Sequence, residues 1–375
     1  MKFFYGCVVS VVLFGCSDQG SLRSAPETEP THRVKRGSKQ GGNAGGRQGS
    51  KKTSDESASL GASVERIQAS HDLHSAEFDS FFTDRGASCP PHRFSVDHRQ
   101  IEFNPVSDMV GSDTTVLVAR DRSLVVKTLA ALPQGSATKK LFEALSMERA
   151  VHEVIGNLDG YSVAMHAIDG NELTPGCLVA TTVSDFGGDY NLDALVGKLN
   201  GRHKDLAKIA ARAVRILRAV HDRGIVHGDV HKKNFVLADL ANPAASLKII
   251  DFGRAAPFVD INGVHIANRR MHSSGWNLAL LSPWELEDSR LSRRDDMYRL
   301  SELLLRLVNA GPLKAAGIGG NSRTQVLGIK RRRFAGPAEL TEFHQAMLLL
   351  QFDEKPDYSK WIRRFTAAAA RGSLN

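Results

Sequence analysis

Two short apolar runs near the middle of the chain have the length and composition of β-strands. The first covers residues 235–238 (Phe-Val-Leu-Ala), and the second covers residues 247–250 (Leu-Lys-Ile-Ile). Between them, Asn-Pro at residues 242–243 favours a turn. The pattern therefore predicts a hairpin, which brings the residues just before and just after it close together.

Polar residues stand at both ends of this hairpin. Asp229 and Asn234 share the loop that leads into the first strand, and Asp251 follows the second strand. Phosphoryl transfer to a hydroxyl needs a group that accepts the hydroxyl proton, and it needs oxygen ligands for the Mg²⁺ on the nucleotide phosphates. Asp229 suits the first task, whereas Asn234 and Asp251 suit the second. These three residues are therefore candidates for a catalytic site.

Other periodic segments indicate a mixture of strands and helices. Paired strands are expected over residues 114–119 and 123–129, and a further strand over residues 177–183. Apolar residues at helical spacing predict helices over residues 137–156 and 204–223. Strands with one helix thus come first, and a long core helix follows them.

The second of the paired strands contains Val125-Val126-Lys127, which resembles the V-A-I-K strand of protein kinases, whose lysine binds the nucleotide phosphates. Lys127 stands in an apolar strand, where a lysine commonly points to solvent, but a helix follows at a spacing that lets a glutamate reach it. We choose Glu148 as the partner, because apolar residues follow it on the inner helix face. Glu143 and Glu153 remain alternatives.

Together these motifs resemble the eukaryotic-type protein kinases. His227-Gly228-Asp229 is similar to the H-R-D triplet, Asp251-Phe252-Gly253 to D-F-G, and Val125-Val126-Lys127 to the V-A-I-K strand. The resemblance implies an α+β, bilobal protein-kinase-like fold, with a small β-rich lobe that carries one helix and a larger, mostly α-helical lobe. The kinase-like domain would span residues 94–375, with the small lobe at 94–183 and the large lobe at 189–375.

The same resemblance implies ATP and Mg²⁺ as cofactors. The metal would lie on Asn234 and Asp251. Residues 184–188 would form the hinge between the lobes, and their backbone would bind adenine. The catalytic set would be Lys127, Asp229, Asn234 and Asp251, and the nucleotide-binding set would be Lys127, Glu148, Ser184, Asp185 and Phe186.

Two runs in the second half are similar to the casein kinase I family. Residues 292–300 (S-R-R-D-D-M-Y-R-L) resemble its S-R-R-D-D-L-x-S-L run, and residues 352–358 (F-D-E-K-P-D-Y) resemble its F-D-D-K-P-D-Y run. The resemblance implies that Asp296 anchors the catalytic loop. It also implies a structural ion pair between Lys355 and Glu285, which stands in the place of the kinase A-P-E glutamate.

The chain departs from a typical kinase upstream of Lys127. Kinases carry a G-x-G-x-x-G loop there, whose backbone N–H groups cover the phosphates. Residues 106–113 hold one glycine and two acids, Asp108 and Asp113, which would repel a triphosphate unless a metal intervened. We therefore expect a site without the glycine-rich loop.

The catalytic loop departs in two further places. Gly228 stands where protein kinases have arginine, so we expect that activation-loop phosphorylation does not switch the activity. His231 stands where they place a lysine, for which Lys232 or Lys233 could substitute. The string H-G-D-x-H-x-x-N also resembles small-molecule kinases with a kinase-like fold.

Charge adds expectations about partners. The 375 residues are 42% hydrophobic and carry a net charge of +8, and lysine and arginine gather at residues 33–52 and 330–333. Such runs can contact nucleic acid, acidic protein or an anionic membrane, although a solvated tail or loop is the more common fate. We expect no nucleic-acid partner and regard peripheral membrane contact through the first run as an option.

The amino terminus has the pattern of a targeting segment. Residues 1–17 combine a lysine with an apolar run that is short for a membrane span, as in a secretory signal peptide. Residues 13–16 (L-F-G-C) also resemble a bacterial lipoprotein box. A disordered basic segment is expected over residues 18–72 and an N-terminal extension over 73–93. An apolar stripe over residues 60–82 could form a helix on a membrane or on the following domain.

The signal peptide, the basic segment, the casein kinase I-like second half and the missing glycine loop together resemble one group. They are similar to the secreted rhoptry and dense-granule kinases of apicomplexan parasites that lack the glycine-rich loop, including a bradyzoite pseudokinase. The resemblance implies secretion to the parasitophorous vacuole, with vacuolar proteins as substrates or binding partners. Cys89 and Cys177 could then form a disulfide, or they could be two buried thiols.

Three functions remain open from the sequence. A Ser/Thr protein kinase is favoured because every polar residue that the reaction needs is present. A pseudokinase that serves as a protein-binding scaffold is favoured by the missing glycine loop and by His231. A small-molecule kinase is favoured only by the catalytic-loop string.

Overall fold

The computed structural model describes most of the chain beyond residue 56. The described residues are 57–72, 93–96, 99–105, 114–129, 136–166, 181–271, 277–309, 322–332 and 334–374. The expected signal peptide, the residues in place of the glycine-rich loop, and Cys89 and Cys177 lie outside these ranges. Within them, no helix is long and apolar enough to cross a membrane.

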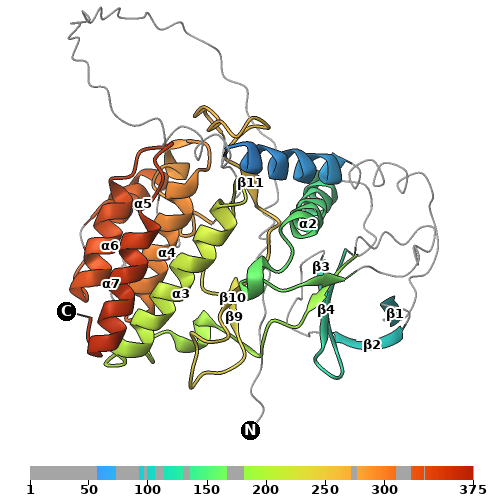
Figure 1. Cartoon of the computed structure of the whole chain (residues 1–375), viewed down its shortest axis with the longest axis horizontal. Coiled ribbons are helices and arrows are strands. Elements are labelled where there is room, and N and C mark those ends of the chain that lie inside the picture. The colour runs from blue at the N-terminus through green and yellow to red at the C-terminus, as the bar shows by residue number, and fades with distance from the viewer. Residues whose placement is uncertain are drawn as a thin grey trace, which may run out of the picture.

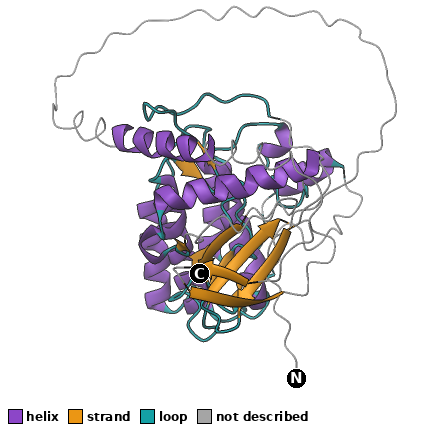
Figure 2. Cartoon of the chain, turned by 90° about the vertical axis from the view of Figure 1, so that its right-hand side faces the viewer, coloured by secondary structure: helices purple, strands orange, loops and turns teal. Residues whose placement is uncertain are grey.

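A six-stranded sheet forms the first lobe, on the right of Figure 1 and facing the viewer in Figure 2. Each neighbouring pair of strands is antiparallel. One helix, α2 (Ser136–Ile155), lies against β5 and β6. The strands in spatial order are β1 (Arg93–Val96), β2 (Arg99–Pro105), β3 (Thr114–Ala119), β4 (Leu124–Leu129), β6 (Thr181–Asp185) and β5 (Met165–His166).

Helices make up most of the second lobe, on the left of Figure 1. Helix α3 packs against α7 and α4, and α4 packs against α6. Apolar side chains at helical spacing along α3, among them Leu206, Ile209 and Leu217, are completely buried. Burial of such a stripe is the main source of stability for a core helix. The helices are α3 (His203–His221), α4 (Arg293–Leu307), α5 (Arg323–Lys330), α6 (Ala338–Leu348) and α7 (Tyr358–Arg371).

Two small sheets shape the region between the lobes. Strand β9 lies between β10 and β7, and β8 pairs with β11. The antiparallel pairing of β9 with β10 is the predicted hairpin. The bounds are β7 (Tyr190–Asn191), β8 (Ile225–Val226), β9 (Phe235–Leu237), β10 (Lys248–Ile249) and β11 (Ala256–Pro257), and the 3₁₀ turns are η1 (Leu158–Gly160), η2 (Leu192–Leu195) and η3 (Glu285–Glu287).

The main predicted elements are present. The strands expected over residues 114–119 and 123–129 are β3 and β4, and the helices expected over 137–156 and 204–223 are α2 and α3. Strand β6 contains the last residues of the strand expected over 177–183 and ends at Asp185, whereas residues 177–180 lie outside the described residues. The fold is the bilobal, kinase-like α+β fold that the sequence predicted.

A helix over residues 57–72, called here the N-terminal helix, corrects one predicted boundary. The sequence predicted disorder up to residue 72, but Val64 and Ile67 of this helix are only 5% and 1% exposed. Their spacing places both on one helix face, and the polar composition of the wider segment obscured this pattern. For these residues, the structure agrees with the expected option of a helix that packs on the following domain.

Candidate active site

Lys127 and Glu148 form an ion pair that joins the sheet to α2. The Lys127 ammonium (Nζ) lies 2.7 Å from Oε1 and 2.9 Å from Oε2 of Glu148, and 3.5 Å from Oδ1 of Asp251. Burial raises the pKa of Glu148, and the charge of Lys127 opposes this effect. Of the alternatives, Glu153 is exposed, and the side chain of Glu143 lies outside the described residues. The pairing chosen from the sequence is therefore present.

Asp229 lies in the catalytic loop and is held from three sides. Its Oδ2 accepts a hydrogen bond from Nδ2 of Asn234 (3.2 Å) and lies 3.4 Å from Nε2 of His231, while its Oδ1 lies 3.4 Å from Arg254. Burial alone would raise the pKa of Asp229, but the His231 hydrogen bond and the charges of Arg254 and Arg299 lower it overall. Asp229 is therefore a carboxylate at neutral pH and a weak base.

Two histidines fix the loop through defined ring nitrogens. Nδ1 of His227 accepts the Asp229 N–H, and Nδ1 of His231 accepts the Lys233 N–H, both at 3.2 Å. Because Nδ1 is an acceptor in both rings, Nε2 carries the proton in the neutral form. Nε2 of His227 then donates to the Ile250 carbonyl (3.0 Å), and Nε2 of His231 donates towards Asp229. His231 thus orients the carboxylate from the position where protein kinases have lysine.

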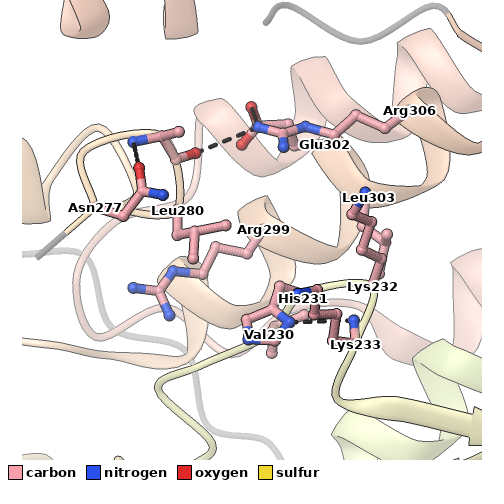
Figure 3. Close-up of a pocket in the computed structure, with 11 residues that line it drawn as sticks. Val230, His231, Lys232, Lys233, Asn277, Leu280, Arg299, Glu302, Leu303 and Arg306 are labelled. Carbon is pink, nitrogen blue, oxygen red and sulfur yellow. Dashed lines mark hydrogen bonds and ion pairs between the residues drawn. The ribbon is translucent and has the colours of Figure 1, made fainter. Parts of the chain in front are cut away.

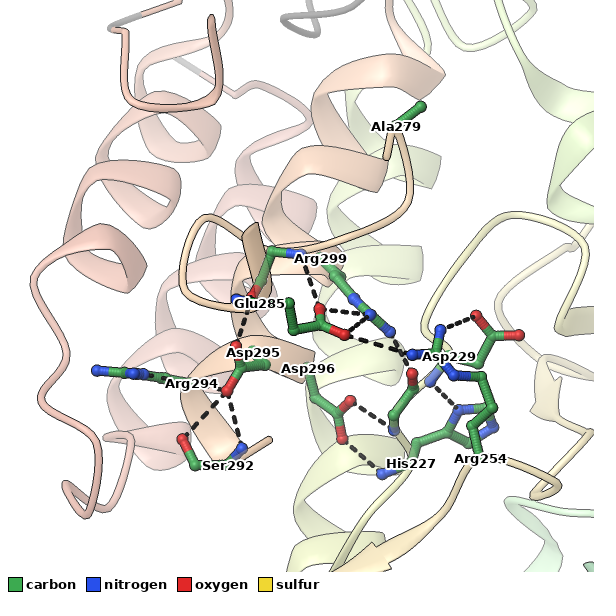
Figure 4. A network of polar contacts seen from close by, with 12 residues as sticks. His227, Asp229, Arg254, Ala279, Glu285, Ser292, Arg294, Asp295, Asp296 and Arg299 are labelled. Carbon is green, nitrogen blue, oxygen red and sulfur yellow. Dashed lines mark hydrogen bonds and ion pairs between the residues drawn. The ribbon is translucent and has the colours of Figure 1, made fainter. Parts of the chain in front are cut away.

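Asp296 anchors the catalytic loop, as the resemblance implied. Its Oδ2 accepts the His227 N–H (2.7 Å), and its Oδ1 accepts the Gly228 N–H (2.9 Å) (Figure 4). His221 of α3 contacts the same carboxylate through Nε2 at 3.0 Å. Burial would raise the pKa of Asp296, but the His221 hydrogen bond and charge lower it. The fully buried carboxylate therefore binds the loop in its ionised form.

Two arginines bind the carboxylate of Glu285. Its carboxylate accepts a hydrogen bond from Nη2 of Arg299 (2.6 Å) and lies 3.4 Å from Nη2 of Arg254 (Figure 4). Glu285 and Arg299 are each 3% exposed, whereas Lys355 lies on the exposed surface. Arg299 of α4 forms this buried ion pair because its guanidinium reaches the carboxylate from within the core, and the pair of Glu285 with Lys355 stays a prediction.

Arg254 is a functional candidate that the sequence analysis missed. It follows the D-F-G motif directly and reaches both Asp229 and Glu285. Its backbone passes so close to Gly228 that a Cβ there would lie 2.3 Å from the Arg254 carbonyl oxygen. The only available signal was an arginine next to D-F-G together with a glycine in place of the H-R-D arginine.

Phe252 of the D-F-G motif links α2 to the catalytic loop through its ring. It meets His152 of α2 edge-on, with ring centroids 5.1 Å apart, and it packs on His227 at 4.8 Å. Burial and the charge of Lys127 lower the pKa of His152 to about 3. The three buried rings therefore form a neutral stack. Its member on α2 lies four residues after Glu148 and was not singled out in the sequence.

The expected hinge is partly corrected. Ser184 and Asp185 belong to strand β6, and Phe186 follows it. The N–H groups of Asp185 and Phe186 donate to backbone carbonyls of the same lobe, at 2.8 and 2.9 Å. These two groups were expected to be free for adenine, but both already have an acceptor. The chain enters the second lobe at Gly188, where φ is +142° and a Cβ would lie 2.4 Å from the backbone of Leu237.

Asn234 and Asp251 are suited to Mg²⁺. The amide Nδ2 of Asn234 donates to the Asp229 carbonyl (2.9 Å), which leaves its Oδ1 as a ligand atom. The Ile250 N–H donates to the Asn234 carbonyl (3.0 Å) and so places Asp251 beside the loop. Amide and carboxylate oxygens are ligands that Mg²⁺ prefers, and it commonly takes only one or two carboxylates besides phosphate oxygens. The described residues contain no cluster of three or more His, Cys, Asp or Glu side chains that could hold a metal.

A cavity of about 200 Å³ adjoins the catalytic loop. Figure 3 shows its walls, which come from residues 230–233, residues 277–280 and helix α4. Basic side chains, including Lys233 and Arg306, outnumber Glu302, the one acid in the lining. His231 contributes to this wall and also contacts Asp229, so the cavity adjoins the Asp229 carboxylate.

Comparison with known proteins supports a kinase relationship. No protein-family model matches this chain. The casein kinase 1-like protein HD16 of rice (Oryza sativa subsp. japonica) is 29% identical to it over 180 residues. The match covers 45% of this chain and 25% of the relative, so the chain spans about a quarter of the length of the curated relative that it matches. The relationship is casein-kinase-like, and the narrower resemblance to secreted apicomplexan kinases stays a prediction.

Proposed function

We propose that this protein is a Ser/Thr protein kinase that transfers the γ-phosphate of ATP to protein hydroxyls without a glycine-rich loop. The position of Lys127 carries the proposal, because its ammonium lies 2.7 Å from Glu148 and 3.5 Å from Asp251. Asp229 and Asn234 stand in the adjoining loop, bound to each other. The relationship to a casein kinase 1-like protein supports the same reaction class.

Each of these groups has one task in the reaction. Lys127 orients the nucleotide phosphates, and Glu148 keeps its ammonium in place. Mg²⁺, when bound by Asn234 and Asp251, supplies positive charge that stabilises the phosphates during transfer. Asp229 accepts a hydrogen bond from the attacking hydroxyl and aligns its oxygen with phosphorus. Because its pKa is low, Asp229 mainly orients the hydroxyl, which suits a loose transition state.

A protein-binding pseudokinase is the second candidate, and one observation favours it. Asn234 and His231 contact one oxygen of Asp229, and Arg254 contacts the other. A substrate hydroxyl must therefore compete with groups that already hold the carboxylate.

A matched pair of lysine variants tests the proposed function. Lys127→Met should lower transfer of labelled γ-phosphate from Mg-ATP to a mixed protein substrate by about 100-fold or more, because the phosphates lose their ligand. Lys198→Met, a change at an exposed lysine, should leave transfer unchanged. Equal rates in Lys127→Met and wild type would exclude transfer at this site.

We also propose that the kinase acts in a secretory or vacuolar compartment. The basis is the signal-peptide pattern of residues 1–17 and the basic run at 33–52. Deletion of residues 1–17 should retain the protein in the cytosol of its cell, as seen by microscopy. Unchanged export of the deleted form would argue against this proposal.

A further inference from the structure

The N-terminal helix (residues 57–72) lies across two parts of the kinase that carry site residues. In Figure 1 it runs, in blue, from the region of β11 to α2. One end meets the chain that follows the D-F-G motif, and the other end meets the helix of Glu148. The sequence placed this segment outside the kinase domain, yet it contacts both lobes.

At its first end the helix makes backbone-to-backbone contact with residues 258–263. A Cβ on Gly61 would lie 2.1 Å from the carbonyl oxygen of Ile261 and 2.9 Å from the N of Gly263. Val64, one helical turn later, is buried with Val226 and Val259 and with Phe258 of the contacted segment. An approach this close is open only to glycine at position 61.

At its second end the helix contacts α2. Ser70 donates a hydrogen bond from Oγ to Oε2 of Glu153, which lies five residues after Glu148 on the same helix. Ile67 is 1% exposed and belongs to the apolar cluster that contains Ala150 and Val151 of α2. The N-terminal helix therefore supports α2 on a side that the sheet does not.

We propose that the N-terminal helix is a strap that holds α2 where Glu148 meets Lys127, so that the functional kinase unit begins at residue 57. The inference rests on the proposed function. Besides the strap, α2 packs on β5 and β6 of its own lobe, and its His152 meets Phe252 of the D-F-G motif. The strap ties it to residues 258–263, which follow Asp251 closely in the chain. Loss of the strap then shifts the population away from the arrangement in which Lys127, Glu148 and Asp251 are together.

A pair of glycine variants in the full chain tests this role. Gly61→Ala puts a Cβ into the Ile261 carbonyl, whereas Gly328→Ala, in helix α5, has nothing within 4 Å of its new Cβ. Both changes raise helix propensity alike, so they differ only in the strap contact. Gly61→Ala should lower kcat for phosphate transfer by about ten-fold with little change in KM for the protein substrate. Gly328→Ala should match the wild type.

Hydrogen–deuterium exchange gives a second readout that does not need activity. Amides of residues 144–155 in α2 should exchange faster in Gly61→Ala than in wild type, while α3 and α7 keep their protection. Wild-type exchange in α2 of a folded Gly61→Ala protein would overturn the strap. If wild type shows no phosphate transfer, the proposed function fails. The exchange measurement still decides whether the strap holds α2.

A milder pair covers the case in which Gly61→Ala does not fold. Ser70→Ala removes the hydrogen bond to Glu153, and Ser70→Thr keeps a hydroxyl in the same place. Exchange in α2 should rise in Ser70→Ala and return to the wild-type rate in Ser70→Thr. Equal exchange in Ser70→Ala and wild type would count against the strap.

Discussion

Gly228 stands directly before Asp229, at a place where the H-R-D motif has arginine. In the sequence this glycine replaces a positively charged arginine, whereas the structure shows that a side chain does not fit at this position. Its φ is +72°, and a Cβ would lie 2.3 Å from the carbonyl oxygen of Arg254. Arg254 in turn brings a guanidinium to Asp229. No local pattern could predict this, because the two residues meet only through the fold.

Gly228→Ala should therefore lower the free energy of unfolding by more than the cost of placing alanine at a positive φ. Gly201→Ala is the control, since Gly201 has φ of +77° and nothing within 4 Å. Its cost should be about 1–2 kcal/mol, the usual penalty for a left-handed Ala. Gly228→Ala should lose at least about 1 kcal/mol more, since overpacking adds to that penalty. Urea denaturation measures both, and equal losses would contradict the steric account.

His152 gives a prediction for pH. Burial and Lys127 lower its pKa from 6.5 to about 3. Below about pH 6.5 the unfolded chain binds a proton that the folded chain does not, so the free energy of unfolding falls by about 1.4 kcal/mol per pH unit. The full contribution is present above pH 6.5 and is lost progressively towards pH 3.

His152→Phe removes this proton and keeps a ring against Phe252. Between pH 7 and pH 5, wild type should lose about 2 kcal/mol more unfolding free energy than the variant. Other titrating groups, such as Asp295, are common to both proteins, so their contributions to the pH dependence of stability largely cancel in the comparison. Urea denaturation at the two pH values decides the matter, and parallel pH profiles would show that His152 is not the source.

At the scale of elements, α4 acts as the base of the catalytic loop. Asp296 in its first turn accepts hydrogen bonds from two N–H groups of the loop. Arg299, which lies one helical turn later, reaches Glu285. The resemblance of residues 292–300 to casein kinase I predicted the first contact correctly. The F-D-E-K-P-D-Y run did not reveal the pairing of Glu285 with Arg299, because a short run does not show which cations the fold brings to a buried carboxylate.

Asp296→Asn should weaken both the loop and the fold. The amide replaces one acceptor oxygen by a donor that faces a backbone N–H, and it removes a buried charge that His221 and the loop satisfy. We expect a loss of about 3 kcal/mol in unfolding free energy and a lower kcat. Asp357→Asn is the control, since asparagine also caps the helix start at this position. Similar stability of both variants would count against the anchoring role.

At the scale of the whole molecule, the sequence predicted two lobes and most elements between residues 114 and 223. Strong periodicity fixed these, because buried faces of strands and helices leave a regular pattern. The N-terminal helix was assigned in part to a disordered segment, since its apolar face is short and depends on surfaces supplied by α2 and by residues 224–263. Boundaries of this kind depend on tertiary contacts that no single segment encodes.

The measurement that tests the kinase assignment most directly is phosphate transfer by wild type and Asp229→Asn. Asp239→Asn, a change in an exposed turn, is the control. All three proteins receive labelled Mg-ATP and a mixed protein substrate. We expect transfer to serine or threonine by wild type and by the control, and a loss of at least about 100-fold in Asp229→Asn. Absence of transfer by folded wild type with both Mg²⁺ and Mn²⁺ would contradict the account and leave a protein-binding pseudokinase.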